Sequence, residues 1–277
     1  MQLSLEQAIR HVKSRFPFED YLPELDDRLE TVGQTVLRYL PRGASVLDFG
    51  CGPCDRTAVL QALGYKCSAA DDLQDDWHRI DGNRDKILAF AKGEGIDFRL
   101  IEGETIPFDG ANFDMVMLHD VLEHLHNSPR DLLNSLLGLV KPAGLLFVTV
   151  PNAVNIRKRI DVLRGRTNLP NFEGYFWYPG QWRGHIREYT RGDLVQLSEF
   201  LSLQTLELGN RHHMLERLNP ALRPAYRLVT RVFPNFSDSL LLVAKKPPGW
   251  KPRTALSAAE VENLLERIPN CPIRVCN

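Results

Sequence analysis

An acid and two glycines stand together in the run Asp48-Phe49-Gly50-Cys51-Gly52, at the end of a short apolar stretch. Glycine is required where the backbone takes a positive φ angle and where a ligand must come close to the main chain. The free amide groups at the start of a following helix favour an anion such as a ligand carboxylate. The pattern predicts a turn that binds a nucleotide-like ligand, although a plain strand–helix turn has the same composition.

The residues around this turn distinguish between nucleotide-like ligands. The dinucleotide fingerprint needs a glycine or alanine three positions after its second glycine, and this chain has Asp55 there. Asp48, two residues before the first glycine, suits a ligand with an amino group better than one with a pyrophosphate. S-adenosylmethionine carries a carboxylate and an ammonium group at one end, so we expect it to be the ligand.

Five segments in order resemble the class I S-adenosylmethionine-dependent methyltransferases, most closely the broad branch that includes ubiquinone-type and small-molecule methyltransferases. The resemblance covers residues 42–152 and, more loosely, 185–246. The segments are Val46–Gly52, which resembles motif I; Asp71, at the end of the second predicted strand; Glu102–Phe108, which resembles an acid-x-acid-x-Leu-Pro-Phe segment; Phe113–Val116 with Val121–Leu125, which resemble the fourth strand and the helix behind it; and Lys141–Phe147, in which Ala143 replaces one glycine of the family pattern.

The resemblance implies that S-adenosylmethionine is the cofactor and assigns residues to it. By this match Glu102 accepts a hydrogen bond from the adenine amino group. Asp71 follows Gly52 at the spacing at which such folds place an acceptor for both ribose hydroxyls. The complete predicted cofactor set is Asp48, Phe49, Gly50, Cys51, Gly52, Asp71, Asp72, Glu102, Gly103 and His119.

Histidines are the candidates for the acid–base chemistry. Methyl transfer from a sulfonium is an in-line displacement, so the protein must align the reacting groups and exclude water. If the acceptor is a hydroxyl, histidine is the natural general base. The candidates are His124, expected in a helix that begins there, His185, in a segment that resembles one near the acceptor pocket of many such enzymes, and His119, which is better placed to contact the cofactor. A packed or helix-capping histidine is the alternative interpretation for each.

The segment from Asn155 to Arg191 is expected to form a lid on the acceptor side, because it is basic and rich in aromatic residues. Arginine recognises phosphate or carboxylate, and aromatic rings stack on flat or sugar faces. The predicted acceptor-binding residues are Arg157, Tyr178, Trp182, Arg187 and Tyr189. The acceptor is then expected to be a small molecule, sugar or lipid-linked compound, with or without an anionic group, methylated at a hydroxyl rather than an amine. Shallow contact with an anionic membrane is compatible with this composition, as is a solvated basic face.

Two other functions compete with this interpretation. Cys51-Gly52-Pro53-Cys54 has the letters of the thioredoxin redox motif, which favours a thiol–disulfide oxidoreductase, but the later acidic residues have no place in that fold. A protein that binds S-adenosylmethionine without turnover is the second alternative. Zinc binding by Cys51, Cys54, Cys271 and Cys276 is a weaker reading, and no metal is predicted.

The elements that must position these residues alternate between strand and helix patterns. Alternation of this kind implies crossover connections and a mostly parallel sheet, with ligands at the carboxyl ends of the strands. We predict a doubly wound, Rossmann-like α/β fold with seven strands and helices on both faces. Strands are expected at 44–49, 66–70, 97–101, 113–118, 145–150, 204–208 and 239–244, with helices at 3–14, 24–40, 56–63, 86–92, 131–140, 220–232 and 258–268.

Domain organisation and composition complete the predictions. We expect an N-terminal helical lid (1–41), the cofactor-binding core (42–152), an irregular lid insertion (153–198), closing strands (199–247) and a tail (248–277). The net charge of −1 disfavours nucleic acid as a partner. The absence of an apolar run of about 20 residues and of a signal-like N-terminus, with five cysteines in a chain of this size, predicts a cytoplasmic protein with reduced thiols. The oligomeric state is left open.

Overall fold

The computed structural model describes residues 2–18, 21–22, 27–103, 105–167, 169–212, 215 and 218–268. A seven-stranded sheet with the order β3-β2-β1-β4-β5-β7-β6 forms its centre. The β5–β7 and β7–β6 pairs are antiparallel and all others are parallel, which confirms the predicted Rossmann-like sheet. The strands are β1 Ser45–Phe49, β2 Lys66–Asp71, β3 Asp97–Leu100, β4 Phe113–His119, β5 Val140–Pro151, β6 Gln204–Arg211 and β7 Ser239–Lys245.

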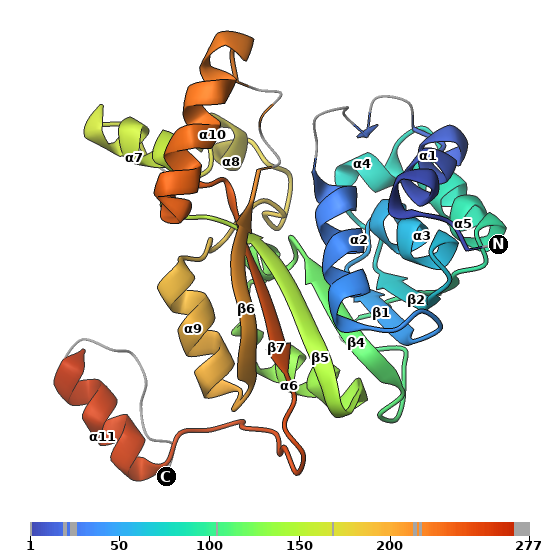
Figure 1. Ribbon diagram of the computed structural model, residues 1–277. Helices are drawn as coiled ribbons and strands as arrows, with labels where there is room; N and C mark the ends of the chain where they lie inside the picture. Colours follow the sequence, from blue (N-terminus) through green and yellow to red (C-terminus); the bar gives the residue numbers. More distant parts are fainter. Residues whose placement is uncertain are drawn as a thin grey trace.

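Helices cover both faces of this sheet (Figure 1). Because the central strands are buried on both faces, they are nearly continuous apolar runs, as in residues 145–150. The helices that bury one face are α1 Leu5–Arg15, α2 Arg28–Tyr39, α3 Asp55–Ala62 and α5 Asn83–Gly93, and those on the other face are α6 Pro129–Leu139 and α9 Arg191–Phe200. The remaining helices are α4 Asp76–Arg79, η2 Leu122–His124, α7 Ile156–Leu163, α8 Phe172–Phe176, η4 Pro220–Leu222, α10 Arg223–Val232, η5 Pro234–Phe236 and α11 Ala258–Arg267.

The lid segment differs from its prediction, because it contains helices. Asn155 caps α7 by accepting from the amide of Lys158, and Asn171 caps α8 by accepting from the amide of Gly174. These caps supply the local signal that starts each helix. The N-terminal helices α1 and α2, which we expected to be part of the lid, bury their apolar faces against α3.

Two boundaries near the site also differ. The helix expected around His124 is the short 3₁₀ helix η2, and α6 begins only at Pro129, where the Ser128 side chain accepts from the amide of Arg130. β5 begins at Val140, five residues earlier than expected, because an irregularity in its pairing with β4 absorbs the turn at Ala143, whose φ is 64°. His124 therefore lies in a tight turn between strand and helix.

The strand order reverses between β1 and β4, which is the point where α/β sheets bind ligands. β5 leads into the lid at this end of the sheet, and Figure 1 shows α7, α8 and α10 gathered there, away from α1 and α2. Among the described residues there is no helix whose length and apolar character would let it cross a membrane.

Candidate active site

The glycine turn after β1 forms the floor of a cavity. Gly50 and Gly52 have φ angles of 72° and 54°, a region that glycine adopts without steric cost. A Cβ atom on Gly50 would lie 2.4 Å from Cγ2 of Val121, whereas one on Gly52 would have nothing within 4 Å. The turn leads into α3, which begins at Asp55 without a side-chain cap. The glycine turn and the uncapped start of α3 therefore line the same cavity.

The cavity has a volume of about 920 Å³ and lies over the carboxyl ends of β1, β2 and β4. This size is typical of small-molecule and cofactor sites. Eight of the ten predicted cofactor residues line it: Phe49, Gly50, Cys51, Gly52, Asp71, Asp72, Gly103 and His119. Glu102 is exposed next to Gly103 and does not line the cavity in this structure, and Asp48 lies behind the cavity wall.

Asp71 ties the end of β2 to the glycine turn. Its Oδ2 accepts from the amide of Gly52 at 2.8 Å, and its Oδ1 accepts from the amide of Leu73 at 2.7 Å. A carboxylate has about four acceptor positions, so both oxygens keep capacity for ribose hydroxyls. Burial raises the pKa of Asp71, and the two backbone hydrogen bonds oppose this shift.

Asp48 is almost completely buried under the same turn. Its Oδ2 accepts from the Thr57 hydroxyl at 2.6 Å, and its Oδ1 has no hydrogen-bond partner among the described residues. Burial raises the pKa of Asp48 to about 6. A buried acceptor without a donor is costly. The unpaired oxygen, the open space at Gly52 and the free helix start together suit a ligand that carries both an ammonium and a carboxylate group.

His119 ends β4 at the cavity wall. Its Nδ1 lies 3.1 Å from the Thr149 hydroxyl, and its ring packs edge-on against Phe147. Burial, assisted by Arg56 and Arg211, holds the pKa of His119 well below its usual range. A neutral imidazole fixed in this way forms part of the cavity wall, and it is poorly suited to take a proton.

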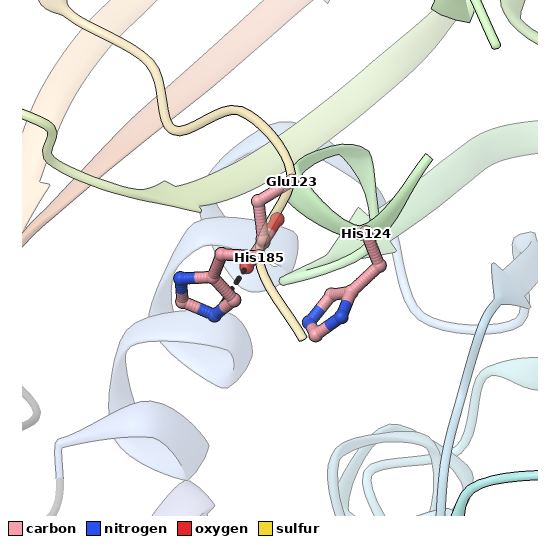
Figure 2. A group of neighbouring side chains, drawn as sticks. All are labelled: Glu123, His124 and His185. Atoms are coloured by element: carbon pink, nitrogen blue, oxygen red, sulfur yellow. Dashed lines mark ion pairs between the residues drawn. The ribbon is translucent and has the colours of Figure 1, made fainter. Parts of the chain in front are cut away.

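Three side chains converge at the cavity rim: Glu123, His124 and His185, which we call the Glu123 cluster (Figure 2). One ligand atom from each lies within 4.8 Å of those of the other two. Glu123 and His124 come from η2, and His185 comes from the lid segment. His124 lines the cavity itself. The amide of Ile186 donates to the backbone carbonyl of Glu123 at 2.6 Å and so ties the lid to η2.

The electrostatics of the Glu123 cluster are unusual. Glu123 is 0% exposed and neither of its carboxylate oxygens has a hydrogen-bond partner among the described residues. Burial, together with the nearby Asp120, raises its pKa well above the usual range. Burial and the neighbouring His124 lower the pKa of His185 to about 4. The imidazole of His185 is therefore neutral at neutral pH.

Of the five predicted acceptor residues, Trp182 lines the cavity and the other four do not. Tyr189 is buried in the core, where its hydroxyl donates to the carbonyl of Leu122. Arg157 pairs with Asp238, and Arg187 is exposed beside Asp193. Tyr178 packs against Trp182 at 5.1 Å between ring centroids, so it contributes to the site only through that ring.

The structure adds two site residues that the sequence analysis did not select. Arg183 reaches from the lid to Asp72 and Asp75 on the other side of the cavity, at 3.0 and 2.6 Å. Glu123 was passed over although it stands beside His124 in the same motif segment. Its apolar neighbours Leu122 and Leu125 were the available signal, because an acid within an apolar run is a candidate for burial.

Of the two cysteines of the redox-like motif, Cys51 lines the cavity and Cys54 is buried beside it. The Sγ atoms of Cys51 and Cys54 lie 3.5 Å apart, and burial raises the pKa of both thiols. Reactive dithiols have lowered pKa values, so this pair has the opposite character. Cys271 and Cys276, the other half of the zinc reading, lie outside the described residues.

Residues 21–207 match the family described as a methyltransferase domain, which is more than half of the chain. The protein therefore belongs to this family. It is an S-adenosylmethionine-dependent methyltransferase of class I, as the resemblance in the sequence predicted.

Curated relatives match a shorter region. The chain is 30% identical over 126 residues to the ubiquinone biosynthesis O-methyltransferase of Xanthomonas axonopodis pv. citri, covering 45% of this chain and 49% of that protein. It is 27% identical over 106 residues to the protein of the same name from Parvibaculum lavamentivorans, covering 38% and 40%. These matches span half or less of the relatives' length.

Solved structures share the fold. An S-adenosylmethionine-dependent methyltransferase from Methanosarcina mazei aligns with a TM-score of 0.54 at 14% identity, over 77% of this chain and 97% of that one. The [4+2]-cyclase SpnF aligns with a TM-score of 0.53 at 15% identity, over 90% and 98%. At such identities the likeness shows the fold alone, and the cyclase illustrates that one fold serves different reactions.

Proposed function

We propose that this methyltransferase transfers the methyl group to a hydroxyl of an acceptor bound in the cavity, beside the Glu123 cluster. The observation that carries the proposal is the position of His124 on the cavity wall, with a buried carboxylate and a second imidazole behind it. Such a cluster promotes loss of a hydroxyl proton. The names of the curated relatives, ubiquinone biosynthesis O-methyltransferases, support a hydroxyl acceptor.

The chain's own residues prepare the cofactor side. Bound S-adenosylmethionine supplies an electrophilic methyl group on a sulfonium. Gly50 and Gly52 leave room for it at the main chain, Asp48 provides an unpaired acceptor behind the turn, and Asp71 provides acceptors for ribose hydroxyls. Arg183 pairs with Asp72 at the opposite rim of the cavity.

The lid holds the imidazole of His124 in one tautomer. The backbone carbonyl of Arg183 lies 2.6 Å from Nδ1 of His124. A carbonyl can only accept, so Nδ1 carries the proton and Nε2 keeps its lone pair. Nε2 of His124 is then the atom that receives a hydroxyl proton. This arrangement favours His124 over His119 and His185 as the base.

We infer that the acceptor is carried by a lipid or an apolar tail. Large apolar side chains are exposed on the lid and on the segment 218–236 beside it: Ile160, Leu163, Phe172, Phe176, Trp177, Leu228, Val232 and Phe233. Basic residues accompany them, and residues 218–236 contain three arginines and no acid, although the whole chain has a net charge of −1. Arg159 lies over the ring of Phe236 and so joins α7 to η5, which follows α10. Apolar groups interleaved with arginine suit an anionic membrane surface.

The test of this function separates binding from turnover. Calorimetry with S-adenosylhomocysteine measures the cofactor site, and mass spectrometry of a phenol and lipid-quinol panel detects products heavier by one CH₂ group. We expect His124→Ala to lower kcat about 10²–10⁴-fold while leaving S-adenosylhomocysteine affinity within about threefold. Binding without turnover on any acceptor would instead support the non-catalytic alternative. If kcat is unchanged in the alanine variants of His119, His124 and His185, none of them acts as a general base, and alignment of the substrates alone must account for the reaction.

A further inference from the structure

We infer that the Glu123 cluster is a binding site for a divalent cation of the zinc class, held by the carboxylate of Glu123 and the imidazoles of His124 and His185. The three side chains are drawn in Figure 2, where the carboxylate lies between the two rings. This inference rests on the proposed function, because it names the species that activates the acceptor hydroxyl.

The first argument is the buried carboxylate. Glu123 is 0% exposed and both oxygens lack hydrogen-bond partners among the described residues. The nearby guanidinium groups of Arg56 and Arg211 hydrogen-bond the carboxylate of Asp120 instead. Nε2 of His185 makes an ion contact with Oε1 of Glu123, but it is 4.0 Å long and this imidazole is neutral at neutral pH. A buried carboxylate without a close partner is expensive, and buried charges are normally paired or bound to metals. A cation between Glu123 and the histidines supplies the missing partner.

The second argument is the orientation of the two imidazoles. Nδ1 of His124 is hydrogen-bonded to the Arg183 carbonyl at 2.6 Å, and Nδ1 of His185 to the Glu188 carboxylate at 2.8 Å. Glu188 in turn pairs with Lys158. Histidines that bind metals typically donate one ring N–H to a carbonyl or carboxylate, which leaves the other nitrogen as the ligand. Both histidines have this partner, and each keeps Nε2 for a cation.

Distance and chemistry then select the ion. Donors around tetrahedral zinc lie about 3.3 Å apart, so donors that lie within 4.8 Å here must each move inward by less than about 1 Å. Two imidazoles and one carboxylate favour zinc-like ions over Mg²⁺ or Ca²⁺, which prefer oxygen ligands. Three protein ligands leave a fourth position for the acceptor oxygen, on the side where His124 lines the cavity.

The role of the cation follows from its charge. A hydroxyl bound at the fourth position has a lowered pKa and releases its proton to solvent, after which the oxygen attacks the methyl group. With the cation bound, Nε2 of His124 is a metal ligand and does not accept the proton of the acceptor hydroxyl. The cation then replaces the imidazole as the group that activates this hydroxyl. Activity that survives complete removal of divalent ions would leave His124 as the base and overturn the catalytic role of the cation.

The test is a titration of ZnCl₂ into chelator-treated full-length protein by calorimetry, with the visible absorption of the Co²⁺-loaded protein as a second readout. We expect one ion per chain. Glu123→Gln and His185→Ala should each raise the Kd for Zn²⁺ by at least about 100-fold, and Glu188→Gln by about 10–100-fold. His11→Ala is the matched control, because His11 pairs with Glu94 on the surface at 3.1 Å and should leave Zn²⁺ binding unchanged.

S-adenosylhomocysteine binding in the same preparations verifies that each variant is folded and separates the two proposals. No Zn²⁺ binding by the unaltered protein, or binding that neither Glu123→Gln nor His185→Ala weakens, overturns the cation site and leaves the methyltransferase assignment intact. Loss of S-adenosylhomocysteine binding in the chelator-treated wild type would instead count against the proposed cavity.

Discussion

The amide of Gly52 donates a hydrogen bond to Oδ2 of Asp71 at 2.8 Å, so the acid at the end of β2 holds the turn that follows β1. The two residues belong to neighbouring parallel strands whose ends meet at one edge of the sheet. In the proposed cofactor site, Asp71 thus fixes the turn that would face the cofactor and keeps acceptor positions for its ribose hydroxyls.

This relationship predicts the effect of Asp71→Ala. Loss of a charge-assisted hydrogen bond costs about 1.5–3 kcal/mol, which corresponds to roughly 10–100-fold weaker binding of S-adenosylhomocysteine. Calorimetry provides the measurement. Asp97→Ala, at the exposed start of β3, is the matched control and should bind normally. Full affinity in Asp71→Ala would show that the turn keeps its shape without this carboxylate.

An added side chain should act differently at the two glycines. Gly50→Ala places a Cβ 2.4 Å from Val121 at a φ of 72°, so we expect a loss of stability of about 2–4 kcal/mol. Gly52 lines the cavity and a Cβ atom there would have nothing within 4 Å, so Gly52→Leu should abolish S-adenosylhomocysteine binding with a smaller loss of stability of about 1–2 kcal/mol.

Thermal unfolding and calorimetry on the same samples distinguish the two effects. Gly138→Ala, in the exposed face of α6 with open space around it, is the control and should be neutral or slightly stabilising. Equal losses of stability at Gly50 and Gly52 would contradict the assignment of Gly52 to the cavity.

Asp48 predicts a pH dependence of stability. Because burial raises its pKa from 3.8 to about 6, the folded protein binds this proton more tightly than the unfolded chain. The resulting stabilisation is present below the unfolded pKa and is lost as the pH rises through about 6. Asparagine does not ionise, so Asp48→Asn should not lose stability as the pH rises. We expect its free energy of unfolding to exceed that of wild type by at most about 3 kcal/mol at neutral pH and to equal it near pH 4.

Denaturant unfolding over this pH range measures the effect, and Asp97→Asn is the surface control. Asp48→Asn should also weaken S-adenosylhomocysteine binding, because the unpaired Oδ1 of residue 48 is then no longer part of a carboxylate. A stability difference that does not change with pH would exclude Asp48 as its source.

The exposed arginines of α10, beside the lid, predict binding to anionic vesicles. Each arginine near such a surface contributes about 1 kcal/mol, so Arg227→Ala with Arg231→Ala should lower partitioning roughly 30-fold. Sedimentation with phosphatidylcholine–phosphatidylglycerol vesicles measures this, and added salt should weaken it. Lys92→Ala, on the exposed side of α5, is the control. Equal binding to pure phosphatidylcholine vesicles would contradict the electrostatic part of the proposal.

Local patterns were sufficient to predict the core of the fold. The alternation of buried strands with helices as far as β5 follows from the spacing of apolar residues, which can be seen in short segments of the sequence. Gly50 and Gly52 could be identified because a turn that exposes its main chain to a ligand requires glycine, which is visible in the sequence. The lid helices α7 and α8 were missed: both are short, and none of their residues is buried, so their apolar side chains do not belong to a core-facing pattern.

The rest of the site depends on contacts between distant segments. Arg183 reaches Asp72 across 111 positions, and no local pattern records that pair. Glu123 was overlooked because the burial of a charged residue depends on the tertiary structure around it. Tyr189 was assigned to the acceptor because it is aromatic, yet it packs in the core. Residue type alone could not decide, because aromatic rings are common both in cores and in binding sites.

The lid segment touches both halves of the site: Arg183 holds Asp72 on the nucleoside side, and its carbonyl, with the neighbouring His185, shapes the acceptor side. We therefore expect that filling one half of the site changes the free energy of filling the other, and any such influence is reciprocal by thermodynamic necessity.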